Sequence, residues 1–242
     1  MSRLCKTTLR RFSPPRCCFL RGMCYNGREI IQGGAVMKAL LINGSPHPKG
    51  CTYTALEELA RTLEAEGIET EIVQAGGRVV CGCTGCGACR KLGKCVYDDA
   101  VNETSPKLLE ADALVIGAPV HYASPAGDAI SFMDRLFYST GIRNLTMKVG
   151  AAVVSCRRGG NTSSFDVLNK YFTIAGMPIA SSQYWNMVYG STPEEVRKDL
   201  EGLQTMRTLG RNMAFLMKAI QLGKTQYGLP QPEPPQVTSF HH

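Results

Sequence analysis

The feature of this chain that most constrains its fold is a regular alternation of two kinds of segment from Met37 onward. Short runs of Val, Ile, Leu and Ala predict β-strands, and each is followed by a stretch whose apolar residues recur every three or four positions, which predicts a helix. Five such units in succession favour a doubly wound α/β fold, a five-stranded parallel sheet with helices on both faces. The expected strands cover residues 40–43, 69–73, 113–117, 149–155 and 178–185.

Capping signals set the expected helix starts. Thr192 as N-cap, Pro193 at the first helical position and Glu195 two residues later form a capping box. Ser124 and Pro125 repeat the first two of these signals. The expected helices cover residues 52–66, 99–110, 124–138, 163–175 and 192–220.

Length and charge limit the classes of protein to consider. The chain has 242 residues, of which 44% are apolar, enough for one sizeable core. Its net charge of +7 comes almost entirely from residues 1–36, which hold six Arg and one Lys against one Glu, so the rest carries only +1. We therefore expect no nucleic-acid partner. No apolar run approaches the roughly 18 residues that a membrane span needs, so we expect no membrane association.

The leader, residues 1–36, shows no hydrophobic periodicity. We favour the hypothesis that translation starts at Met37, because Gly33-Gly34 is what a bacterial ribosome-binding site would encode if it were read as protein. An Arg-rich transit peptide is the alternative.

The remainder divides into one domain and a tail. Residues 37–222 form the domain, with a Gly- and Cys-rich insert at 76–97, and the Pro- and Gln-rich residues 223–242 are expected to be extended or disordered. Because no secretory signal is found, the expected location is the cytoplasm, where thiols stay reduced.

Four of the eleven cysteines are closely spaced within the insert, in the pattern Cys-x2-Cys-x2-Cys-x5-Cys. Thiolates at such short intervals can all face one iron–sulfur cubane. A tetrahedral zinc site is the first alternative, and a loop that holds no metal is the second. Cys81 stands too close to the first ligand to be an obvious further one, and Cys156 is expected to be a small buried residue. The candidate ligands are Cys83, Cys86, Cys89 and Cys95.

Residues 40–54 predict a strand, a tight loop and a helix start. Free backbone N–H groups and the positive end of the helix dipole converge there, which suits a phosphate. The alternative is an ordinary βα turn with a capped helix. The loop has neither the Walker nor the G-x-G-x-x-G spacing, which disfavours those nucleotide-binding classes. The candidate phosphate-binding residues are Ser45, Lys49, Gly50, Cys51 and Thr52, with the hydroxyl of Thr54 as a further donor.

Two more loops follow apolar strands and should meet the first at the carboxyl edge of the sheet. His121 or Tyr122 can flank a flat cofactor ring, although a half-buried packing ring is the alternative for Tyr122. Arg157 and Arg158 would stabilise negative charge on such a ring, with a solvated surface pair as the alternative. The candidate residues in the two loops are Pro119, Val120, His121, Tyr122, Ala123, Ser124, Ser155, Arg157, Arg158, Gly159 and Gly160.

Together these motifs resemble those of the NAD(P)H-dependent FMN reductase family, which has a flavodoxin-like fold. The motifs are Asn43-Gly-Ser-Pro-x3-Gly-x-Thr52, Pro119-Val-His-Tyr122 followed by Asp134-Arg135, and Arg157-Arg-Gly-Gly160. The resemblance covers about residues 38–221. It implies that the first loop holds the FMN phosphate and that residues 119–124 and 157–160 flank the isoalloxazine. The chain departs from similar loops at His47 and Cys51, where Arg and Asn are common.

The cysteine spacing resembles that of the iron–sulfur flavoprotein branch of the same family, which implies a [4Fe–4S] cluster close to the flavin. The resemblance implies a flavin-dependent oxidoreductase that transfers a hydride from NAD(P)H to bound FMN, and electrons on to a small-molecule acceptor or a redox protein. The flavin carries the chemistry, so no catalytic residue is expected, and His121 and Tyr122 line the pocket. An FMN and iron–sulfur electron-transfer protein without NAD(P)H turnover is one alternative, and a scaffold that has lost its flavin is another. The family also implies a homodimer or homotetramer.

Overall fold

The computed structural model describes residues 36–234, 236 and 238, and within them the chain forms a parallel sheet with a short antiparallel appendage. The strand order is β2-β1-β3-β5-β6, with β4 pairing antiparallel to the end of β3. This is the order of the flavodoxin-like doubly wound sheet, so the predicted fold class is confirmed. The strands are β1 Lys38–Asn43, β2 Glu69–Gln74, β3 Ala113–His121, β4 Ser124–Pro125, β5 Val149–Cys156 and β6 Met187–Tyr189. The predicted leader and the end of the predicted tail lie outside the described residues.

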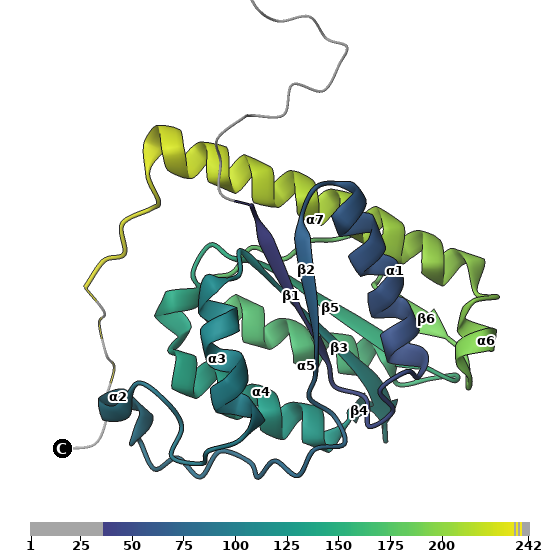
Figure 1. Cartoon of the computed structure of the whole chain (residues 1–242), viewed down its shortest axis with the longest axis horizontal. Coiled ribbons are helices and arrows are strands. Elements are labelled where there is room, and N and C mark those ends of the chain that lie inside the picture. Colours follow the sequence, from purple (N-terminus) through teal and green to yellow (C-terminus); the bar gives the residue numbers. More distant parts are fainter. Residues whose placement is uncertain (1–35, 235, 237, 239–242) are drawn as a thin grey trace, which may run out of the picture. The chain divides into compact units, whose positions relative to one another are not determined.

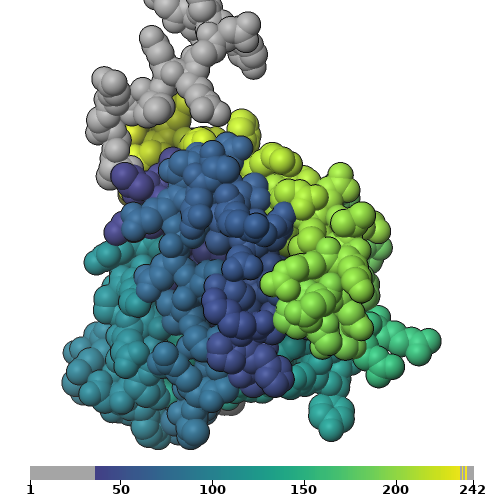
Figure 2. All heavy atoms as spheres, turned by 45° about the vertical axis from the view of Figure 1, so that its right-hand side comes forward, coloured from purple at the N-terminus to yellow at the C-terminus, as the bar shows by residue number. Residues whose placement is uncertain are grey.

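Helices cover both faces of the sheet (Figure 1). One apolar core joins the sheet to α1, α6 and α7, and the other joins it to α3, α4 and α5. Figure 2 shows the dark blue α1 beside the yellow-green segment that contains α6 and the start of α7. The helices are α1 Cys51–Ala65, α2 Cys89–Leu92, α3 Ala100–Glu110, α4 Gly127–Thr140, α5 Asn161–Ile174, α6 Pro193–Val196 and α7 Leu200–Tyr227, with a 3₁₀ turn at Ile142–Leu145.

The fifth strand is not where the sequence predicted it. Residues 178–185 make only an isolated bridge, between Ile179 and Gly150, and the strand forms instead at Met187–Tyr189. Its register pairs Met187 with Val154 at the far end of β5. Pairing with an already buried strand decided the position, and the aromatic-rich stretch before it stays outside the ladder.

Two helix starts also differ from the prediction. Ser124 and Pro125 form β4 rather than an N-cap, and α4 begins at Gly127. Thr192 does cap a helix, since its hydroxyl accepts from the Glu195 amide, but that helix ends after one turn. The long α7 then starts separately at Leu200 and continues to Tyr227, so the first residues of the predicted tail are helical.

The register of the sheet brings the strand ends together. Asn43 pairs with Gly117 across β1 and β3, and Pro119 pairs with Ser155 across β3 and β5. The loops that leave β1, β3 and β5 therefore begin side by side at one edge. Among the described residues, no helix has the length and apolar character needed to cross a membrane.

Candidate functional site

The loop between β1 and α1 is held by the amide side chains of Asn43, which is buried, and Gln74, which is partly buried. Asn43, which is 0% exposed, accepts a hydrogen bond from the Ser45 amide at 3.2 Å and donates to Gln74 Oε1 at 2.6 Å. Gln74 in turn donates to the Ser45 carbonyl at 2.7 Å and to the Gly76 carbonyl at 2.6 Å. Buried amides with satisfied partners fix a backbone in one conformation, so this loop is preorganised before any ligand binds.

The start of α1 presents free donors beside that loop. Within the described part of the chain, no backbone carbonyl accepts from the amides of Cys51, Thr52 or Tyr53. These groups lie at the positive end of the helix dipole, which is the environment that binds a phosphate. The predicted cation takes a different position, because the Lys49 ammonium lies 3.7 Å from the centre of the Tyr53 ring.

The three hydroxyls that were predicted to donate to a phosphate each have a different partner. Ser45 Oγ accepts from the His47 amide and keeps its own proton available for an acceptor. Thr52 Oγ1 lies 2.7 Å from Ser155 Oγ, and this buried pair joins the start of α1 to the end of β5. The prediction for Thr54 is wrong, because its hydroxyl donates to the Gly50 carbonyl within the same helical turn.

The β3–β4 connection is a two-residue hairpin turn in an unusual conformation. Its central residues Tyr122 and Ala123 have φ of 50° and 57°, the left-handed conformation of both positions that a type I′ turn requires. Neither residue is one that favours this region, so the turn stores conformational strain. Tyr122 is fully exposed, which excludes the half-buried packing alternative in the single chain.

The β5–α5 loop holds that turn in place. Ser163 Oγ donates to the Ala123 carbonyl at 2.6 Å. Gly160 has φ of +86°, and a Cβ there would lie 2.6 Å from Ala123 Cα, so only glycine permits this approach. Arg157 and Arg158 are exposed, and no acidic side chain among the described residues forms an ion pair with either, which leaves both predicted alternatives open.

We call the meeting place of residues 44–54, 119–124 and 155–160 the three-loop edge. The groups present there fit an FMN. The free amides at the start of α1 and the Ser45 hydroxyl can bind the phosphate, and the Tyr122 turn and the arginines of the β5–α5 loop can flank the ring. Gly76 packs closely against the first of these loops, because a Cβ there would lie 2.4 Å from the Gly44 carbonyl oxygen. The structure brings the starts of the three predicted loops together at this one edge.

The two isolated cysteines near this edge are not activated thiols. Cys51 Sγ donates to the Gly190 carbonyl at 3.5 Å, and burial is the main cause that raises the pKa of Cys51. Cys156 is buried as predicted, and burial likewise raises its pKa. Both therefore remain protonated at neutral pH.

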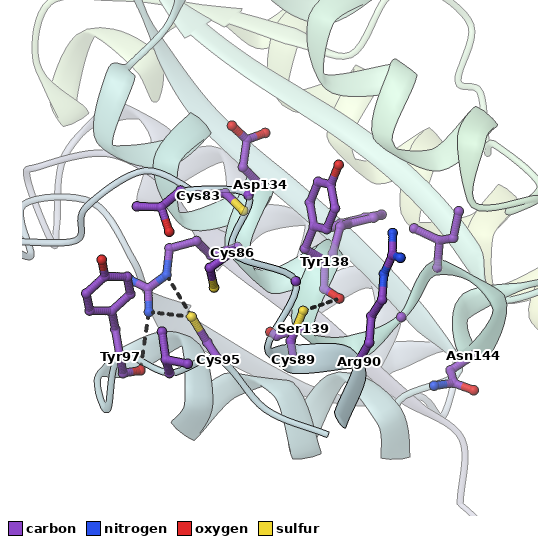
Figure 3. A pocket seen from close by; sticks show the side chains of 18 of the residues that line it. Cys83, Cys86, Cys89, Arg90, Cys95, Tyr97, Asp134, Tyr138, Ser139 and Asn144 are labelled. Atoms are coloured by element: carbon purple, nitrogen blue, oxygen red, sulfur yellow. Dashed lines mark hydrogen bonds between the residues drawn. The ribbon is translucent and has the colours of Figure 1, made fainter. Parts of the chain in front are cut away.

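The four insert cysteines line a different part of the molecule, a hollow of about 910 Å³ between the insert, α4 and α5. Figure 3 shows Cys83, Cys86, Cys89 and Cys95 around this space, which we call the cysteine hollow. Aromatic side chains complete it, among them Tyr97, Phe137, Tyr138 and Tyr171. The interspersed glycines at 85, 87 and 93 all have positive φ, which lets the chain turn tightly between the thiols.

The four thiols of the hollow are ligands that both an iron–sulfur cluster and a zinc ion use. In the part of the chain that the structure describes, no three His, Cys, Asp or Glu side chains converge as a group that could hold a metal ion. Zinc would need four sulfurs crowded at about 2.3 Å from a single point. A cubane is larger, and its four thiolate ligands stand farther apart than those of one zinc ion.

Arg135 links the insert to the body of the protein. Its side chain is 1% exposed and forms an ion pair with Asp99, the N-cap of α3. The same guanidinium donates to Cys95 Sγ and to the Tyr97 carbonyl, the bonds that the dashed lines mark near Cys95 in Figure 3.

Sequence reasoning gave no role to several of these residues. Asn43 and Gln74 end neighbouring strands, and a polar residue closing an apolar strand was the signal that could have found them. Arg135 sits among the apolar residues Phe132, Met133, Leu136 and Phe137 of α4, where a lone charge indicates a buried partner.

A flavodoxin-like sheet with this three-loop edge defines a flavin-binding protein of the α/β class. More closely, the chain belongs to the NADPH-dependent FMN reductase family, whose family model matches residues 37–192. It is 32% identical over 195 residues to an iron-sulfur flavoprotein of Methanocaldococcus jannaschii, covering 76% of this chain and 100% of that protein. It is 28% identical over 191 residues to an iron-sulfur flavoprotein of Methanosarcina thermophila, covering 76% and 97%.

Solved structures agree on the fold. A flavodoxin from the domain Archaea superposes with a TM-score of 0.52 at 19% identity, covering 75% of this chain and 99% of the flavodoxin. The family and the fold together make this chain an oxidoreductase-type flavoprotein that resembles the iron–sulfur branch.

Proposed function

We propose that this protein oxidises NADH or NADPH with FMN bound at the three-loop edge, and passes the electrons to a small-molecule or protein acceptor. The observation that carries the proposal is the buried contact of Thr52 with Ser155. It joins the phosphate loop to the loop that would flank the ring, so one ligand with a phosphate at one end and a flat ring at the other can span both.

Each part of the edge has a task in this proposal. The amides of Cys51, Thr52 and Tyr53 and the Ser45 hydroxyl would bind the phosphate. The strained turn at Tyr122 and Ala123 would orient one ring face, and the charges of Arg157 and Arg158 would favour electron-rich forms of the ring. When bound, FMN supplies the hydride and single-electron chemistry itself. The protein therefore needs to bind, orient and shield rather than to donate a proton.

We further propose that Cys83, Cys86, Cys89 and Cys95 hold a [4Fe–4S] cluster in the cysteine hollow. Support comes from the four thiols around one space and from the likeness to proteins named iron-sulfur flavoproteins. A cluster there would supply one-electron transfer toward an acceptor.

A second function is favoured by the position of the hollow. Arg135 lies eight residues into α4, about 12 Å along the helix axis from Gly127, and Gly127 follows shortly after the turn that would flank the ring. Two separated redox groups suit an electron-transfer protein, which would accept electrons from another protein without turning over NAD(P)H.

The deciding experiment measures composition and turnover on one anaerobic sample. Iron, sulfide, zinc and FMN are quantified per chain, and steady-state oxidation of NADH and of NADPH is then followed with a quinone as acceptor. We expect FMN near one per chain, about four irons with matching sulfide, and turnover with at least one nucleotide above that of free FMN.

Each other outcome has a defined meaning. Bound FMN without turnover on either nucleotide would leave the electron-transfer function. A protein that acquires no flavin absorbance from added FMN would contradict both functions. Zinc without sulfide would replace the cluster by a structural metal site.

We also propose that the protein assembles as a homodimer or homotetramer. Large exposed side chains support this: Tyr122 at the three-loop edge, Tyr184 and Trp185 before β6, and Phe215 on α7. Sedimentation equilibrium would test it, and a monomer at micromolar concentration would contradict it.

A further inference from the structure

Among the described residues, Arg135 is the one buried charged side chain that lines the cysteine hollow, and the proposed function leaves it without a task. It projects from the middle of α4, and its guanidinium contacts groups of the insert from Cys81 to Asp99. A buried arginine is costly unless its donors are satisfied, so the partners that it contacts indicate what the charge is for.

The contacts of Arg135 fall mainly on the side chains of Asp99 and Cys95, and further contacts reach the Tyr97 carbonyl at 3.3 Å, the Cys81 carbonyl at 3.5 Å and Cys81 Sγ at 3.8 Å. Nη1 and Nη2 donate to the two Asp99 carboxylate oxygens at 2.6 and 3.0 Å, the bidentate geometry that fixes a guanidinium plane. Nε and Nη2 donate to Cys95 Sγ at 3.3 and 3.2 Å. Asp99 therefore sets the orientation of the guanidinium, and Cys95 is the sulfur that receives two of its N–H groups.

Arg135 is a charged donor in this position, because a guanidinium is not deprotonated in proteins and has no acceptor atom. Cys95 Sγ therefore accepts two N–H groups from a cation, at 3.3 and 3.2 Å.

We propose that Arg135 is a positioning residue for the cluster: it holds the Cys95 sulfur in place as a ligand and raises the reduction potential of the cluster through two N–H···S hydrogen bonds. The inference rests on the cluster proposed above. Its physical reason is that reduction adds negative charge to a cluster and its sulfurs, and hydrogen bonds or a positive charge at a sulfur stabilise that added charge.

A purely structural role for Arg135 predicts something different. If the residue only ties the insert to α4 through Asp99 and the Tyr97 carbonyl, its replacement would lower the thermal stability and the iron and FMN content together, but would not change the potential of a fully loaded cluster. The reduction potential therefore separates the two roles.

The experiment compares three variants with the wild-type holoprotein. Arg135→Lys keeps a charge but loses the planar fork, and the double variant Arg135→Gln with Asp99→Asn removes both members of the ion pair without leaving a buried carboxylate alone. Arg143→Gln is the matched control, because Arg143 also lines the hollow but is exposed and makes no hydrogen bond to a sulfur among the described residues. Iron, sulfide and FMN are quantified, and the midpoint potential is measured by anaerobic titration followed by electron paramagnetic resonance.

We expect the double variant to be at least about tenfold harder to reduce, a shift of about 59 mV to more negative potential for a one-electron couple. Arg135→Lys should shift less, and Arg143→Gln should match the wild type. Loss of iron from both Arg135 variants, with FMN content and thermal unfolding unchanged, would also support the positioning role.

Two results would overturn the inference. One is a fully loaded Arg135 variant with the wild-type potential, and the other is loss of iron together with FMN and cooperative unfolding, which would make the role structural. A wild-type protein without iron and sulfide would instead overturn the cluster itself, so the two failures are distinguishable.

Discussion

The three-loop edge and the cysteine hollow are held in place in opposite ways. At the three-loop edge the anchoring side chains Asn43, Thr52 and Ser155 are buried and pair with one another or with the ends of core strands. In the hollow, Cys83 and Cys86 are exposed, and a main tie between the insert and the core is the buried Arg135. The first site is built by the fold, whereas the second is a loop attached to it.

This difference indicates how each site would bind its proposed cofactor. A preorganised edge loses little conformational entropy when a ligand binds. Ligation of the proposed cluster would draw together sulfurs that lie on a loop, so its binding and the ordering of the insert would be coupled. The two sites should therefore be separable by mutation.

The largest expected effect is loss of the cluster without loss of the flavin. Cys86→Ser should reduce iron from about four atoms per chain to near zero, because one missing thiolate opens the cubane, while FMN content stays unchanged. Iron, sulfide and flavin assays on the purified protein measure this. Cys81→Ser is the matched control and should keep its iron. If FMN is lost together with iron, the two sites are not independent.

A converse variant should damage only the three-loop edge. Gly76→Ala places a Cβ 2.4 Å from the Gly44 carbonyl oxygen, so the phosphate loop must shift. We expect the Kd for FMN to rise roughly 10- to 100-fold, about 1.4–2.8 kcal/mol, with iron content unchanged. Fluorescence titration with FMN measures it. At Gly223 an added Cβ would meet nothing within 4 Å, so Gly223→Ala should bind FMN as the wild type does.

Preorganisation of the edge can be tested through Asn43. Asn43→Ala leaves the Ser45 amide and the Gln74 side chain without their buried partner, so the free energy of unfolding should fall by about 2 kcal/mol. Urea denaturation of the flavin-free protein measures this. Asn212→Ala removes an exposed amide and should cost less than about 0.5 kcal/mol. Equal losses in the two variants would contradict the anchoring role.

The smallest expected effect concerns thiol reactivity in metal-free protein. At pH 8, Cys83 and Cys86 should be alkylated roughly tenfold faster than Cys51 and Cys156, because the latter pair is less accessible and burial raises the pKa of each thiol above 9.0. Only the thiolate reacts, so the rate at Cys51 should keep climbing as pH rises past 9.0. Peptide mass spectrometry with iodoacetamide resolves each site, and a plateau for Cys51 below pH 9 would contradict the burial effect.

The sequence predicted the three-loop edge because its signals are local. Apolar runs, a Gly-rich turn and a helix pattern lie within a dozen residues of one another, and parallel pairing then brings the strand ends together. The same locality explains the errors. Ser124 and Pro125 carry helix-start signals, but Pro125 is buried and pairs with Val120, so tertiary pairing overrode the capping preference.

Residues that act across the chain could not be predicted in this way. Cys95 and Arg135 are 40 positions apart, and Asn43 and Gln74 are 31 apart. No periodicity or spacing links such pairs, because their contact depends on how α4 and the strands pack. The position of β6 at 187–189 is a similar case, since pairing with β5 decided it.

The sequence by itself therefore determined the α/β class, the candidate phosphate loop and the identity of the candidate metal ligands. Those features follow from composition and from spacing along a few turns of chain. Only the tertiary structure decided that Asn43 and Gln74 anchor the loop, that Tyr122 stands exposed on a strained turn, and that a buried arginine faces Cys95. The physical reason is that burial and charge pairing depend on three-dimensional neighbours, which a linear pattern does not contain.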